Sequence, residues 1–167
     1  ISTSLISDDI AIPWAMVQLP TREILISERK GELRVLKNNR LLPKRITGLP
    51  EIHHNGQGGL LDLALHPDFS KNNWLYFTYA SKEGKKSGSN TALMRATLNM
   101  ETLSLTNQTV LYKAQPNSYS RQHYGSRIVF DDKGFIYFSI GDRGQRDINP
   151  QNLNKDGGKI YRLHDDG

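Results

Sequence analysis

The residue in this chain best suited to acid–base chemistry is His123, within the run Arg121-Gln122-His123-Tyr124-Gly125. A histidine takes up and releases a proton near neutral pH, so His123 is a candidate general base. It stands just before an apolar run, and loops at strand ends often carry functional residues. Considered alone, a histidine held in place by loop hydrogen bonds is the simpler interpretation.

A second candidate is Gln57, which lies among three glycines at positions 56, 58 and 59. Glycines allow the backbone to approach a neighbour closely or to adopt positive φ. The glutamine amide both donates and accepts hydrogen bonds, which suits a planar ligand that carries carbonyl groups. The alternative is a turn whose glutamine faces water.

The third candidate is Asp142, within Gly141-Asp142-Arg143-Gly144 at the end of an apolar run. The Asp-Arg pair could position hydroxyl groups or a base. The alternative is a tight turn closed by a surface ion pair, which contributes little to stability.

Composition restricts the remaining functional classes. With 37% hydrophobic residues, the chain can bury a core, and its net charge of +5 is spread along the sequence. No basic stripe with interleaved aromatic residues indicates nucleic-acid binding, and no apolar run reaches membrane-spanning length. There is no cysteine, which excludes disulfides and thiolate chemistry. His53 and His54 are adjacent and would point opposite ways in an extended chain, so we expect no metal site.

Short alternating runs that predict strands surround these candidates, and no amphipathic helix of three turns is evident. The sequence therefore predicts an all-β fold. The clearest predicted strands are 23–28, 32–37, 60–65, 74–79, 92–98, 126–130, 135–140 and 159–163.

A loose repeat of apolar strand, polar turn and aromatic-rich strand begins near Pro13, Gly58 and Gly125. Repeats of a few short strands are typical of β-propeller blades. We expect a partial propeller of about three blades, at about 12–48, 58–113 and 125–167, the last incomplete. A β-sandwich is the alternative, but the repeat includes the turns as well as the strands.

The three candidate segments occur in this order in one family. The chain resembles the soluble PQQ-dependent glucose and aldose sugar dehydrogenases, also called the glucose/sorbosone dehydrogenase family. The matching stretches are Pro13–Ala15, Ser27–Arg34, Gly56–Phe69, His123–Phe130, Ile140–Gly144 and Gly158–Leu163. The resemblance covers nearly the whole chain.

The resemblance implies a six-bladed propeller of four-stranded blades, with PQQ in a central cleft and calcium as a second cofactor. His123 matches the catalytic base, Gln57 a glutamine that hydrogen-bonds the cofactor, and Asp142 an acid near the sugar. The implied reaction oxidises an aldose at C1 to the lactone, with hydride transfer to PQQ. The implied location is periplasmic or secreted.

Two departures from the family pattern shape further expectations. Family members commonly carry Asp or Asn before the catalytic histidine, where this chain has Gln122. The family's Arg-Asn cofactor contact and calcium loops are expected to follow Gly167, so we expect this N-terminal half to be inactive alone. Uncovered strand edges and blade faces favour a homodimer or association with the C-terminal half. The alternative function is a non-catalytic propeller that binds a carbohydrate or protein partner.

Overall fold

The computed structural model describes residues 1–167 and confirms the all-β prediction. Its only α-helix is the four-residue α1 (Phe69–Asn72), and no helix is long and apolar enough to cross a membrane. The strands are β1 (Pro13–Gln18), β2 (Ile24–Glu28), β3 (Glu32–Lys37), β4 (Arg40–Leu41), β5 (Leu60–Leu65), β6 (Trp74–Ser81), β7 (Asn90–Asn99), β8 (Ser104–Lys113), β9 (Gly125–Phe130), β10 (Ile136–Ile140) and β11 (Lys159–Leu163).

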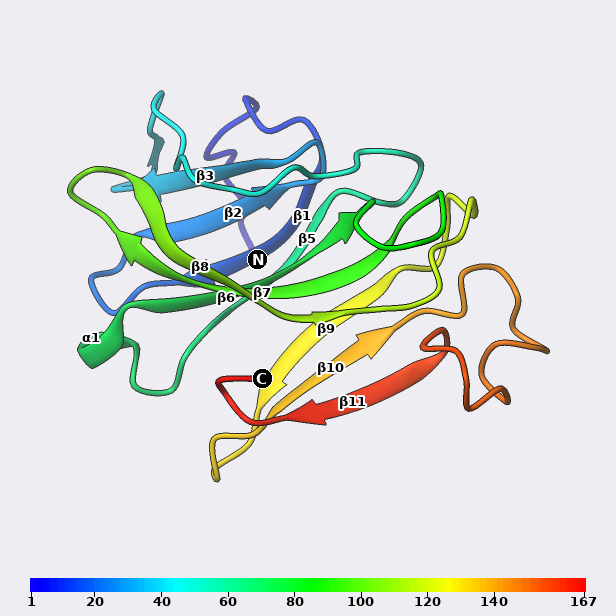
Figure 1. Ribbon diagram of the computed structural model, residues 1–167. Helices are drawn as coiled ribbons and strands as arrows, with labels where there is room; N and C mark the ends of the chain where they lie inside the picture. The colour runs from blue at the N-terminus through cyan, green and yellow to red at the C-terminus, as the bar shows by residue number, and fades with distance from the viewer.

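The strands form three antiparallel sheets in which each strand pairs with its neighbour in the sequence. The orders are β1-β2-β3-β4, β5-β6-β7-β8 and β11-β10-β9. Short turns between consecutive strands favour this pairing, because antiparallel neighbours can be joined directly. Figure 1 shows the three sheets following one another across the molecule, with the β9–β11 sheet at the C-terminal end.

The first strands of consecutive sheets lie beside one another. β5 contacts β1 and β2 on one side, and β9 contacts β5 and β6 on the other. Successive sheets are therefore packed face to face, with their first strands on the same side of the molecule. This arrangement is compatible with propeller blades, but the division into three blades of a six-bladed ring stays a prediction.

The middle sheet is buried on both faces, as the packing of β6 makes clear. Leu75 and Phe77 belong to the large core shared with the first sheet, whereas Tyr76 belongs to the core shared with the third. Successive side chains of a strand point to opposite faces, so a strand covered on both sides reads as a continuous apolar run. The sequence LYFTYA of β6 has this character.

The strand β8 was missing from the runs expected on sequence patterning. Its sequence SLTNQTVLYK is largely polar, and most of its central residues are exposed. It is the last strand of its sheet, where it pairs with β7 and makes only a single bridge, from Ser104 to Thr47, on its other side. Because an edge strand with little apolar contact needs no alternating pattern, patterning by itself could not find it.

The third sheet is covered on one face only. Ile128 and Phe138 are buried against the middle sheet. On the opposite face Val129 is 54% and Ile160 78% exposed. This face has no neighbouring sheet within residues 1–167.

Candidate functional site

Three loops meet at one end of the sheets, and each carries one of the sequence candidates. Gln57 precedes β5, His123 precedes β9, and Asp142 follows β10. Because β9 and β10 are antiparallel, the start of β9 and the end of β10 lie at the same edge. Since β5 contacts β9, the loop before β5 reaches this edge as well.

His123 and Asp142 form a hydrogen-bonded pair at this edge. The distance from His123 Nδ1 to Asp142 Oδ1 is 2.8 Å. The imidazole side chain is 48% exposed, whereas the carboxyl side chain is 20% exposed. The imidazole of His123 is therefore accessible to solvent, and the less exposed carboxylate of Asp142 lies behind it.

The electrostatics of the pair determine which imidazole nitrogen is free. The hydrogen bond from His123 lowers the pKa of Asp142, and the N–H of Gly144, which donates to the same oxygen at 2.7 Å, lowers it further. An ionised carboxylate can only accept hydrogen bonds, so His123 carries its proton on Nδ1 when it is neutral. The lone pair of Nε2 is then available to accept a proton.

Gln57 contacts the backbone of the histidine. The side-chain Oε1 of Gln57 accepts a hydrogen bond from the backbone N–H of His123 at 2.8 Å. The backbone N–H of Gln57 donates to the carbonyl of Arg121 at 2.8 Å. Gln57 is exposed to solvent, but its side chain also holds the backbone of the histidine loop. Because the amide oxygen is occupied, the two N–H groups of Nε2 remain as donors toward a ligand.

The backbone of His123 adopts a conformation that few residues other than glycine favour, with φ of 54°. Such conformations persist only where surrounding contacts fix them. The 141–144 turn supplies one such contact, because the Arg143 N–H donates to the His123 carbonyl at 3.3 Å. A Cβ atom at Gly141 would lie 2.0 Å from that carbonyl oxygen, so only glycine allows this approach.

Asp142 and Arg143 do not form the surface ion pair that was the alternative for this turn. Asp142 bonds the His123 imidazole, while Arg143 is buried and donates to the carbonyls of Ser120 and Gln122. The turn thus holds the histidine loop through both side chain and backbone. Sequence patterning gave no indication that a basic residue in a Gly-rich turn would be buried.

Asn149 is another residue that the sequence did not single out. It lies in the long loop between β10 and β11, and its Nδ2 donates to the carbonyl of Asp142 at 2.8 Å. Its Oδ1 accepts a hydrogen bond from Lys155 at 3.2 Å. An asparagine in a loop of ordinary polar composition carries no pattern that marks such a role.

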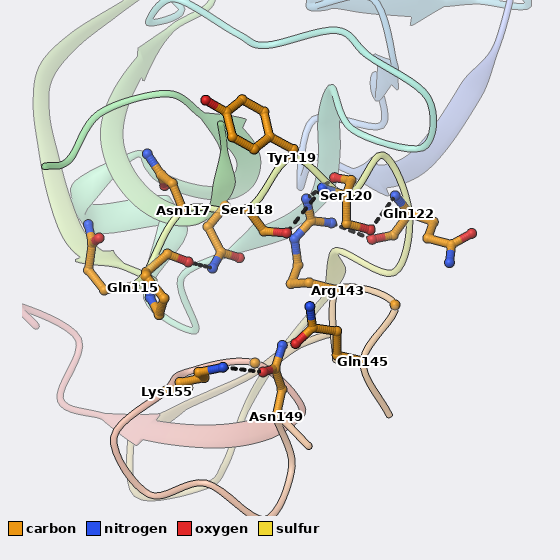
Figure 2. Close-up of a pocket in the computed structure, with 14 residues that line it drawn as sticks. Gln115, Asn117, Ser118, Tyr119, Ser120, Gln122, Arg143, Gln145, Asn149 and Lys155 are labelled. Carbon is orange, nitrogen blue, oxygen red and sulfur yellow. Dashed lines mark hydrogen bonds between the residues drawn. The ribbon is translucent and has the colours of Figure 1, made fainter. Parts of the chain in front are cut away.

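Two adjoining cavities lie at this edge. One, of about 440 Å³, is lined by His123, Asp142 and the 144–148 segment. The other, of about 450 Å³, is polar, and it shares Gln122, Gly144 and Gln145 with the first. Figure 2 shows polar side chains around the second cavity, with Gln115, Asn117 and Ser118 on one side and Gln145, Asn149 and Lys155 on the other.

The donor chemistry at this edge fits a planar quinone better than it fits a metal. The Nε2 donors of Gln57 suit carbonyl or carboxylate oxygens, and His123 Nε2 is free beside them. No group of three or more His, Asp or Glu side chains in residues 1–167 could hold a metal ion. The calcium that the family resemblance implies therefore stays a prediction.

Comparison with known proteins identifies relatives for this architecture. A sequence model of the family described as Glucose / Sorbosone dehydrogenase matches residues 10–167. The chain is 33% identical over 168 residues to the aldose sugar dehydrogenase YliI of Escherichia coli (strain K12), covering 100% of this chain and 45% of that protein. It is 28% identical over 180 residues to quinoprotein glucose dehydrogenase B of Acinetobacter calcoaceticus, covering 93% of this chain and 37% of that protein.

The fold has a solved counterpart. A crystal structure of the soluble aldose sugar dehydrogenase from Escherichia coli, in the apo-form, matches with a TM-score of 0.90 and 32% identity. The match covers 97% of this chain and 46% of that one. The chain thus spans less than half the length of each of these three relatives.

Proposed function

Because the chain belongs to the glucose/sorbosone dehydrogenase family, we propose that the protein containing it oxidises aldose sugars at C1 to the lactone, with PQQ as hydride acceptor. The observation that carries this proposal is the hydrogen bond between His123 and Asp142, which leaves Nε2 of an accessible imidazole free. The sugar dehydrogenase names of the relatives support the substrate class.

In the proposed reaction His123 is the general base. Its Nε2 accepts the proton of the anomeric hydroxyl, which raises electron density on the oxygen and favours departure of hydride from C1. The O–H and C1–H bonds break, and a C1–O double bond forms. Asp142 keeps the imidazole oriented and stabilises the imidazolium that results, as a carboxylate does for the histidine of a hydrolase triad. It thus supports the base rather than only contacting the sugar.

The cofactor would be held in part by Gln57. PQQ when bound would supply a two-electron acceptor, which protein side chains alone cannot provide. The Nε2 donors of Gln57 suit its carbonyl and carboxylate oxygens, while the Oε1 atom keeps His123 beside it. The quinoprotein name of the Acinetobacter relative supports this assignment.

Location and assembly are proposed on the same basis. The family resemblance supports a periplasmic or secreted protein. The uncovered face with Val129 and Ile160 favours further contact, either with the rest of a longer chain or with a second copy. Size-exclusion chromatography with light scattering on the full-length protein distinguishes these, since only a second copy doubles the mass.

The test is dye-coupled oxidation of aldoses by the full-length protein, with product identified as the lactone. We expect activity that depends on added PQQ. Reduction of the dye without PQQ, or the absence of reduction with every aldose offered, would contradict the proposal. Residues 1–167 alone are expected to be inactive.

A second candidate function is carbohydrate binding without chemistry. The polar cavity next to His123 favours it, because amides such as those of Gln115 and Gln145 can donate to and accept from sugar hydroxyls. Saturable binding of an aldose by the full-length protein, without oxidation in the presence of PQQ, would support this alternative.

A further inference from the structure

The guanidinium of Arg143 is buried without a carboxylate partner. The residue is 2% exposed, and Asp142 beside it in the sequence is bonded to His123 instead. Burial lowers the pKa of Arg143, with nearby Tyr124 and Asp142 acting in the opposite direction. An arginine retains its charge under such conditions. Burying a cation is unfavourable unless it is hydrogen-bonded. The groups that accept hydrogen bonds from Arg143 therefore indicate its structural role.

Those partners belong to the loop that carries His123. One terminal nitrogen of Arg143 donates to the carbonyl of Gln122 and the other to that of Ser120. Figure 2 shows the side chain reaching from its turn to this loop, with dashed lines to both residues. The two carbonyls lie three and one positions before His123. The planar fork of arginine is suited to binding two acceptors at once.

A third contact fixes the plane of the guanidinium. Its carbon lies 3.4 Å from the ring centroid of Tyr124, the residue after His123. The Tyr124 hydroxyl is in turn 2.7 Å from the hydroxyl of Ser89, in a buried pair. Arg143 therefore contacts the loop on both sides of His123. The Tyr124 ring that it packs on is itself fixed by the bond to Ser89.

The contacts made by Arg143 surround a residue with strained backbone, His123. His123 has φ of 54°, and further positive φ values follow at Gly125 and Ser126, where β9 begins. Left-handed backbone at a residue other than glycine is strained and relaxes unless contacts prevent it. If the carbonyls of Ser120 and Gln122 were released, the simplest relaxation would rotate His123 away from Asp142.

We propose that Arg143 is a positioning residue for His123, whose guanidinium fixes the Ser120–Gln122 backbone so that the imidazole stays hydrogen-bonded to Asp142. The effect on the imidazole is independent of any reaction. Only its effect on rate rests on the proposed function.

The first test reads the histidine itself. In full-length protein labelled with ¹⁵N-histidine, NMR of the two ring nitrogens reports the tautomer of His123. We expect the wild type to show the Nδ1–H form and Arg143→Met to show a mixture of both tautomers. Arg34→Met is the matched control, because Arg34 is also buried but pairs with Glu28 at 2.7 Å and has no hydrogen bond to the histidine loop. It should lower stability and leave the His123 signal unchanged.

The second test reads the rate. Arg143→Lys keeps the charge but loses the planar fork, and we expect kcat for aldose oxidation to fall roughly 10- to 100-fold, as small misplacements of reacting groups do. KM should change less than about twofold. In Arg143→Ala, added guanidinium ion should restore part of kcat, whereas methylammonium should not.

The outcomes separate the possibilities. Wild-type tautomer and kcat in Arg143→Lys, combined with lowered stability alone, would overturn the positioning role. If Arg143→Met does not fold, Arg143→Lys and the rescue experiment decide in its place. A wild-type protein that oxidises no aldose contradicts the proposed function, while the tautomer measurement still tests the positioning role.

Discussion

The Nδ1 atom of His123 lies 2.8 Å from Oδ1 of Asp142, although the two residues are 19 positions apart. Between them run β9, a tight turn and β10, which form a hairpin. The hairpin brings its two ends together, so the loop before β9 and the turn after β10 become neighbours. A base and its orienting acid are thus assembled by one of the simplest units of β structure.

Removing the base is expected to abolish most of the proposed activity. In the full-length protein, His123→Ala should lower kcat for aldose oxidation roughly 10²- to 10⁴-fold, the range that a general base supplies. The matched control is His164→Ala, since His164 is exposed and its ring lies beside that of Phe135. Undiminished turnover in His123→Ala would exclude the assigned role.

Replacing the acid should separate orientation from folding. Asp142→Asn retains the size of the side chain. Because an amide can donate as well as accept, it no longer restricts the proton of neutral His123 to Nδ1. We expect a mixture of imidazole tautomers and a kcat at least about tenfold lower, while the variant still folds at pH 7. Steady-state kinetics and ring-nitrogen NMR measure the two effects. A variant that keeps both the wild-type tautomer and the wild-type rate would show that Asp142 does not orient the base.

The lowered pKa of Asp142 predicts a pH dependence of stability. An aspartate in an unfolded chain has a pKa of about 3.9, and in the folded protein the hydrogen bond from His123 holds the pKa below its usual value. The stabilisation is therefore present above pH about 4 and is lost as the pH falls through the folded-state pKa. The difference in unfolding free energy between wild type and Asp142→Asn should shrink below pH about 4 in urea titrations. A constant difference from pH 7 to pH 2 would argue against this linkage.

Gln57 offers a variant that divides its two roles. Gln57→Glu keeps an oxygen to accept the His123 N–H but removes both amide donors. We expect stability to change little, while PQQ binds the full-length protein at least about tenfold more weakly. Gln57→Ala should show the same loss of binding and also lower stability by roughly 0.5–1 kcal/mol. Equal PQQ affinity in titrations of wild type and Gln57→Glu would remove Gln57 from the cofactor site.

A buried carboxylate connects the second sheet to the third. Asp62 in β5 accepts the Ile128 N–H at 2.7 Å and a hydrogen bond from Arg127 at 3.1 Å. Asp62→Ala would leave the buried Ile128 N–H without a partner, so we expect a loss of about 1–3 kcal/mol in unfolding free energy. Asp132→Ala, at an exposed turn, is the control and should stay close to wild type. Equal stability of the two variants in chemical denaturation would contradict the structural role of Asp62.

Local patterning was sufficient for much of the fold. The strands β2, β3, β5 and β6 are buried against neighbouring sheets. Their residues are therefore alternately or continuously apolar, and this pattern can be recognised in the sequence. The polar edge strand β8 was not predicted, since its residues face solvent. Pairing with the neighbouring strand β7 makes that segment a strand.

The site divides in a similar way. The sequence by itself determined the all-β class, the family, and the three segments that carry Gln57, His123 and Asp142, because these depend on residue type and order. Only the tertiary structure decided that Gln57 binds the backbone of His123, that Asp142 bonds its ring, and that Arg143 lies buried beneath the loop. The reason is physical: a hydrogen bond requires two atoms within about 3 Å in a defined direction. Such distances arise only when strands far apart in the sequence pack together.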